Sequence, residues 1–105
     1  QEEVLILCLS RANKILNYYK VSKGGTSGTI VDIKIIYTAA LNAPGTTSII
    51  LAHNHPSGAL TPSAADIAIT KRVKEAGIII DIKLLDHLII TDSGYYSFAD
   101  EGQLN

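Results

Sequence analysis

Residues 53–66 read HNHPSGALTPSAAD and gather two imidazoles, a hydroxyl and a carboxylate between an apolar run and a helical pattern. The apolar run, residues 48–52, is short and rich in β-branched side chains, which predicts a buried strand with His53 and His55 at its end. Side chains alternate along a strand, so both imidazoles are expected on one face and Asn54 on the other. The stretch is therefore expected to be the point where a strand leads into a helix.

The same stretch ends in a Ser-x-x-Asp sequence directly before the helical pattern, which places Asp66 in the first helical turn. Two imidazoles at a strand end and a carboxylate on the next helix are a ligand set that suits Zn²⁺. Three protein ligands leave the fourth tetrahedral position for water, as in catalytic rather than structural zinc sites. The pattern predicts a zinc metallohydrolase with His53, His55 and Asp66 as metal ligands.

Each of these features also has a structural interpretation. Ser63-x-x-Asp66 has the form of a capping box, in which Asp66 does no more than stabilise the start of a helix. A lone His-x-His is more often a surface or core feature than a metal site. The metal site is favoured by the conjunction, because all the elements fall where a strand meets a helix.

A wider comparison of motifs supports the metal site. The sequence His-x-His-Pro, six further residues and Ser-x-x-Asp, which runs from His53 to Asp66, resembles the JAMM motif of the MPN/JAB metalloprotease superfamily. The chain more narrowly resembles the bacterial RadC family, whose members have been labelled DNA repair proteins. The segments that carry this resemblance are AHNHPSG at 52–58, LDHLII at 85–90 and YYSF at 95–98.

The resemblance covers nearly the whole chain, so residues 1–105 are interpreted as a single RadC-like JAB/MPN domain. It implies an α/β fold, a mixed β-sheet flanked by helices in a cytidine-deaminase-like/MPN sandwich. It also implies a peptidase-like or isopeptidase-like hydrolysis of an amide bond, with a peptide or isopeptide as substrate. The chain begins abruptly at Gln1, which leads us to expect a fragment of a longer protein.

The JAMM pattern further implies a glutamate, upstream of the histidines and on another strand, that acts as general base. Glu2 and Glu3 are the acidic residues in a suitable strand, and they point to opposite faces. Aligning the end of this strand with that of the family favours Glu2, with Glu3 as the alternative. Ser63 matches the motif serine, whose hydroxyl helps to stabilise an oxyanion; helix capping is its competing role. His87, beside Asp86, is interpreted as a hydrogen-bonded structural histidine.

Composition limits the range of functions. Nine basic and ten acidic residues give a net charge of -1. A strong nucleic-acid binder usually carries a clear excess of positive charge, which this chain does not have. The dense basic cluster Lys71, Arg72 and Lys74 is interpreted as a solvated helix face. It is also the residue-level support for an alternative function, a DNA-associated RadC-type module without established catalysis. The single cysteine, Cys8, in an apolar run and the lack of a membrane-spanning run or signal peptide make the cytoplasm the expected location.

The remaining chain is expected to supply the scaffold. Residues 30–41 fit both a strand and a helix, and the resemblance favours the helix. Gly77 is expected to cap the helix that follows the motif. The other expected elements are a strand hairpin at 2–9 and 14–21, a Gly-rich surface loop at 22–29, a helix at 63–76, strands at 78–85 and 88–91, a turn at 92–94 and a fraying tail at 99–105.

Overall fold

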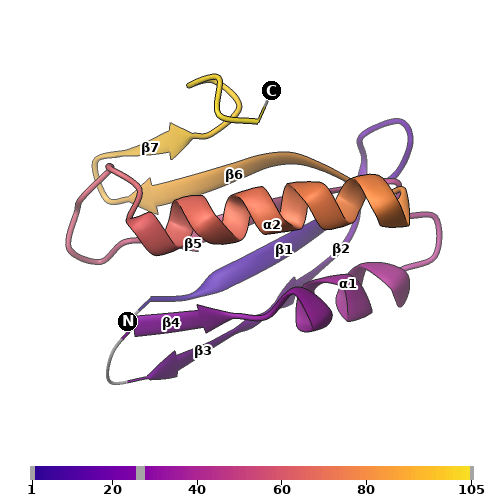
Figure 1. The fold of residues 1–105 in the computed structure, drawn as a ribbon, viewed down its shortest axis with the longest axis horizontal. Helices are drawn as coiled ribbons and strands as arrows, with labels where there is room; N and C mark the ends of the chain where they lie inside the picture. The colour runs from indigo at the N-terminus through magenta and orange to yellow at the C-terminus, as the bar shows by residue number, and fades with distance from the viewer. Residues whose placement is uncertain (1, 26–27, 105) are drawn as a thin grey trace.

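The computed structural model of the chain describes residues 2–25 and 28–104. Within these residues a five-stranded mixed sheet has the strand order β2-β1-β5-β6-β7, and β3 and β4 form a separate hairpin (Figure 1). The bounds are β1 Val4–Leu9, β2 Ile15–Lys20, β3 Ser22–Gly25, β4 Gly28–Val31, α1 Ile33–Leu41, β5 Ser48–Asn54, α2 Ala64–Ile80, β6 Lys83–Thr91 and β7 Gly94–Ser97. The predicted fold class, an α/β fold with a mixed sheet and helices, is confirmed.

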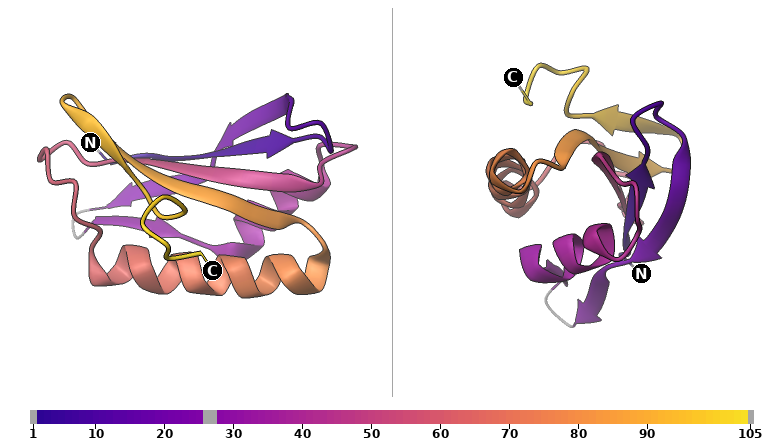
Figure 2. Two further views of the ribbon diagram at one scale, coloured as in Figure 1. Left: turned by 90° about the horizontal axis from the view of Figure 1, so that it is seen from above. Right: turned by 90° about the vertical axis from the view of Figure 1, so that its right-hand side faces the viewer.

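Both helices cover the same, concave side of the sheet (Figure 2). Alternate side chains of β1, namely Val4, Ile6 and Cys8, are buried and join the core that Ile36 of α1 and Val73 of α2 complete. β1 lies between β2 and β5, as its run of apolar residues on both faces predicts. The predicted hairpin of the first two strands is also confirmed, because β1 and β2 pair antiparallel.

The site is positioned by the crossover from β5 through α2 to β6. β5 and β6 are parallel, so the chain must return along the sheet between them, and α2 makes that return. The C-terminal end of β5 and the N-terminal end of α2 consequently meet at one edge of the sheet, the edge at which ligands bind in many parallel sheets. Residues 53–66 form this junction.

The Gly-rich segment differs from the prediction. We expected a surface loop at 22–29, and instead β3 and β4 pair antiparallel, with Ser22 opposite Val31; residues 26–27 lie outside the described residues. Residues 30–41 fitted both a strand and a helix because a strand ends and a helix begins within them. Strand β4 ends at Val31, and Asp32 then caps helix α1 by accepting a hydrogen bond from the Lys34 backbone amide at 2.8 Å.

Helix α2 is longer than predicted. Gly77 does not cap it, because the helix continues to Ile80 and ends at Asp81, which adopts a left-handed conformation at φ 66°. The predicted start of a strand at residue 78 is therefore wrong, because residues 78–80 belong to α2. A helix rises about 1.5 Å per residue and a strand about 3.3 Å, so the seven residues of β5 need roughly fifteen helical residues for the return. A helix ending at residue 76 would stop short.

The C-terminal part also departs from the prediction. The strands predicted at 78–85 and 88–91 are one continuous strand, β6, with a bulge after Leu84. The tail does not fray over residues 99–104, where turns are held by bonds such as Gln103 N–H to Phe98 O at 2.8 Å. Over residues 2–25 and 28–104, neither length nor apolar character would let any helix span a membrane.

Candidate metal centre

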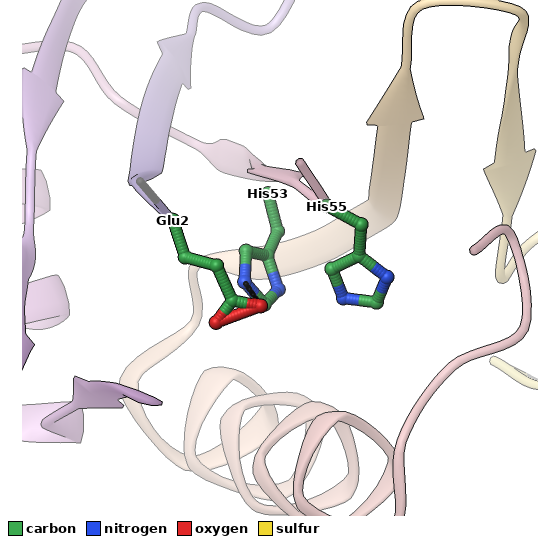
Figure 3. Close-up of side chains that lie close together, drawn as sticks. All are labelled: Glu2, His53 and His55. Atoms are coloured by element: carbon green, nitrogen blue, oxygen red, sulfur yellow. Dashed lines mark ion pairs between the residues drawn. The ribbon is translucent and has the colours of Figure 1, made fainter. Parts of the chain in front are cut away.

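His53 and His55 lie together at the end of β5 (Figure 3). Their ring centroids are 4.8 Å apart and the rings meet edge to face, so both imidazoles lie on one face, as the alternation of a strand requires. Both side chains are buried. Burial lowers the pKa of His53, with the neighbouring His55 adding to the effect and Asp66 opposing it. His53 is therefore neutral at pH 7, the form that binds a metal.

Asp66 faces both rings from the first turn of α2. Its Oδ1 lies 3.2 Å from His53 Nδ1 and its Oδ2 lies 3.3 Å from His55 Nε2. Burial alone would raise the pKa of Asp66, but hydrogen bonding from Ser63 and the two histidines outweigh burial and hold it below its ordinary value. The buried carboxylate is consequently ionised at neutral pH and fixed beside the two imidazoles.

Ser63 holds Asp66 in this position through a capping box. The Ser63 backbone amide donates to Asp66 Oδ2 at 2.8 Å, and Ser63 Oγ accepts from the Asp66 backbone amide at 3.0 Å. The capping box that the sequence predicts is therefore present, and Asp66 forms it while also contacting both histidines. The Ser63 hydroxyl proton takes no part in either bond, because Oγ is the acceptor.

Of the two candidate glutamates, Glu2 is the one that faces the histidines. Glu2 Oε1 lies 3.8 Å from His53 Nε2 (Figure 3). Glu3 instead forms an exposed ion pair with Lys20 at 2.7 Å. Asn54 explains the placement. The side-chain oxygen of Asn54 accepts from the Glu3 backbone amide, and the backbone amide of Asn54 donates to the Glu3 carbonyl oxygen at 3.2 Å. The chain just before β1 is therefore bound to the end of β5.

The spacing of these groups fits a small divalent ion. Bonds of about 2.0 Å in a tetrahedral site place neighbouring ligand atoms about 3.3 Å apart, which matches the contacts of Asp66 with the two rings. Ligand atoms of Glu2, His53 and His55 also lie within 4.8 Å of one another. Glu2 is thus the carboxylate that shares one compact group with both histidines. Asp66 contacts the two rings through different oxygens and faces the other nitrogen of His53, so it would form an alternative ligand set with the histidines.

The second nitrogen of His55 is already used in a way that prepares the ring for a metal. His55 Nδ1 lies 2.9 Å from the Ala59 carbonyl oxygen, to which it must donate. That bond fixes the tautomer and leaves the lone pair on Nε2, the atom that faces Asp66. Gly58 makes this turn possible, because its φ of 84° is costly for other residues.

Three contributors to the site carried no signal that we used in the sequence. Ala59 acts through its backbone, and Asn54 was expected only to lie on the face opposite the histidines. Thr70 lies one turn after Asp66 on the same side of α2; its hydroxyl donates to Asp66 O at 2.6 Å and meets His87 Nδ1 at 2.5 Å. The i, i+4 spacing of Thr70 from Asp66 was the one available clue.

These features define a RadC-like JAB domain whose His-His-Glu cluster can hold a metal ion. The model of the RadC-like JAB domain family matches residues 1–103, and the chain belongs to this family.

The chain is similar to proteins called UPF0758 protein. The one from Flavobacterium johnsoniae is 54% identical over 101 residues, which are 96% of this chain and 44% of the relative. The one from Porphyromonas gingivalis is 47% identical over 105 residues, which are 99% of this chain and 46% of the relative. The chain thus spans less than half the length of these curated relatives.

Proposed function

We propose that this domain is a zinc-dependent hydrolase of amide bonds, of the peptidase or isopeptidase kind. The observation that carries the proposal is the position of the ionised Asp66 carboxylate, with its two oxygens 3.2 and 3.3 Å from nitrogens of His53 and His55. Two neutral imidazoles and one carboxylate are a ligand set of catalytic zinc sites. Family membership supports the same chemistry.

In this proposal His53, His55 and Asp66 hold the ion. Zinc held in this way would make water acidic enough to act as a nucleophile near pH 7 and would polarise the amide carbonyl. Glu2, the other carboxylate of the cluster, takes the proton of the attacking water and passes it to the leaving amine. The Ser63 hydroxyl donates its hydrogen to the carbonyl oxygen as negative charge develops there.

The first test is metal binding by the purified protein. We expect one zinc per chain and at least a tenfold loss of affinity in His53→Ala and Asp66→Asn. Glu3→Gln is the matched control, because Glu3 lies next to Glu2 in the sequence but pairs with exposed Lys20. Zinc content unchanged in both ligand variants would end the proposal.

Glu2→Gln separates the two ligand sets. If Asp66 completes the site and Glu2 is the base, Glu2→Gln binds zinc with nearly unchanged affinity but loses 10²–10⁴-fold in turnover of a peptide or isopeptide substrate. If Glu2 is itself a ligand, zinc affinity falls in Glu2→Gln and is retained in Asp66→Asn. Because the chain spans less than half of its relatives, substrate screening belongs with the longer protein.

A DNA-associated module is the second candidate. The supporting observation is that Lys71 and Arg72 are exposed on α2. Binding through such a patch would weaken steeply with salt. For each phosphate neutralised, a tenfold increase in salt concentration should lower the affinity about tenfold. Lys71→Gln combined with Arg72→Gln should reduce that slope, and an absence of DNA binding at low salt would eliminate this candidate.

A further inference from the structure

His87 is a buried histidine that the proposed hydrolysis does not use. It is 2% exposed, on the inner face of β6. Its ring stacks on Phe98 at a centroid distance of 4.8 Å, and on its other side the His53 ring lies nearly parallel at 6.1 Å. His87 is therefore held rigidly beside the cluster without being part of it.

The hydrogen bonds of Thr70 fix which nitrogen of His87 carries a proton. The Thr70 hydroxyl has one hydrogen, which it donates to the Asp66 carbonyl oxygen at 2.6 Å. Thr70 Oγ1 can then only accept from His87 Nδ1, at 2.5 Å, so Nδ1 is protonated. Among the described residues, Nε2 of His87 has no acceptor beside it that would stabilise a second N–H, so it keeps a lone pair. Burial, with His53 as the next cause, lowers the pKa of His87 to about 4, which agrees with this geometry.

This lone pair is an unused acceptor. Nε2 of His87 is fully buried and has no hydrogen-bond partner within residues 2–25 and 28–104. A buried acceptor left unpaired costs free energy, and a ligand that supplies a donor recovers it. The acceptor therefore favours ligands that carry an N–H or O–H at this point.

His87 also lines a pocket of about 250 Å³ that adjoins the cluster. The other lining side chains include the aliphatic groups of Val4, Val31, Leu51 and Ile69, together with His53. An apolar cavity of about 150 Å³ is large enough to bind benzene, so this pocket has room for a large side chain. Its walls favour an apolar group, and His87, whose Nε2 has no partner in the part of the chain that the structure describes, is one of the few polar residues among them.

We propose that this pocket selects substrates by binding an apolar side chain that bears one N–H or O–H donor, and that His87 Nε2 accepts the hydrogen bond. The proposal names a feature of the substrate and rests on the proposed hydrolase function for its biological meaning. The side chain would lie beside the scissile amide, because His53 and Asp66 line the same pocket. Under this proposal His87 determines specificity.

The test uses indole and indene, which have nearly the same shape and differ in that only indole has an N–H. Binding of each is measured by titration calorimetry with the metal-free protein in chelator, so the outcome does not depend on zinc or on turnover. We expect indole to bind at least about tenfold more tightly than indene, the scale of one hydrogen bond to a buried acceptor. In His87→Phe, which keeps an aromatic ring against Phe98, that preference should vanish.

Equal binding of the two probes to the unaltered protein, or binding of neither, would overturn the proposal and leave the hydrolase proposal standing. An indole preference that survives in His87→Phe would overturn it as well. If His87→Phe does not fold, the ¹⁵N resonance of His87 Nε2 in the unaltered protein decides the matter. It should move toward the value of a hydrogen-bonded nitrogen with indole and stay unchanged with indene.

Discussion

Several residues of the site combine two functions. Ser63 caps α2 and at the same time fixes the carboxylate of Asp66, so helix stability and site geometry depend on one side chain. Thr70 likewise connects the backbone of Asp66 to the ring of His87. A substitution at either residue therefore affects both the fold and the site.

Ser63→Ala should lower the free energy of unfolding by about 1 kcal/mol, the usual cost of losing an N-cap side chain. Ser63→Thr retains a capping oxygen and should cost much less. Chemical denaturation of both variants measures the difference. A Ser63→Ala variant as stable as the parent would mean that the bond to the Asp66 amide contributes nothing.

His87 should make stability depend on pH. Its pKa is lowered to about 4 in the folded protein, against about 6.5 when unfolded. Between these values the unfolded state binds more protons, so acidification from pH 6.5 to pH 4 removes about 3 kcal/mol of stability. Asp66 adds no slope in this window. Its pKa is lowered in the folded protein, so the stability that its carboxylate contributes is lost only as the pH falls below 3.8, the ordinary pKa of the group.

The measurement is the free energy of unfolding of metal-free protein from pH 7 to pH 4, compared with His87→Phe. We expect a flatter profile in the variant, although His53 contributes a slope of the same sign in both proteins. Identical profiles would show that His87 is readily protonated in the folded state.

At the scale of elements, the sequence predicts what depends on local pattern. The apolar run before His53 and the Ser-x-x-Asp before α2 are local signals, and both elements were predicted at the right place. The hairpin of β3 and β4 was missed, because glycine has a low β-propensity and the pairing is a backbone property. The end of α2 was missed because it depends on the distance that the helix must span.

The bulge in β6 shows the same limit at the site. Ile49 lies opposite Leu84 and Ile50 opposite Asp86, so Leu85 is an extra residue in β6. Without it, strict alternation from Leu84 would turn the Asp86 carboxylate into the core and His87 away from it. Instead Asp86 accepts from Ser97 Oγ at 2.5 Å, outside the site. No local pattern in the sequence indicates this shift.

Gly77 gives a prediction for α2. Replacing glycine by alanine inside a helix normally stabilises it by about 1 kcal/mol. At Gly77 an added Cβ would lie 2.4 Å from the Ile82 carbonyl oxygen and 2.8 Å from the Tyr37 hydroxyl, so the backbone or the tyrosine must move. We expect Gly77→Ala to lower the free energy of unfolding by about 2 kcal/mol.

Ile79→Ala is the matched control for Gly77→Ala. Its side chain is 86% exposed on the same helix, so the substitution should change stability by less than about 0.5 kcal/mol. Thermal unfolding of both variants gives the comparison. A stabilising Gly77→Ala would mean that α2 does not approach Tyr37 as closely as the structure has it.

At the scale of the whole molecule, the site joins segments that are far apart in the sequence. Glu2 precedes β1, the histidines end β5 and Asp66 begins α2, and the pairing of Val4 with His53 brings the first two together. The crossover brings in the third. A metal bound here would link the sheet to the helix layer, so its binding energy would add to the stability of the fold.

Zinc should therefore raise the melting temperature of the domain. At a free concentration of 100 times the Kd, binding adds about 2.7 kcal/mol, which shifts the melting temperature of a domain of this size by on the order of 10 °C. Hydrogen exchange should slow at the end of β5 and the start of α2, because His55 and Asp66 then move together. The shift should disappear in His55→Ala and persist in Glu3→Gln. Zinc that raises the melting temperature of His55→Ala as much as that of the parent would place the ion elsewhere on the chain.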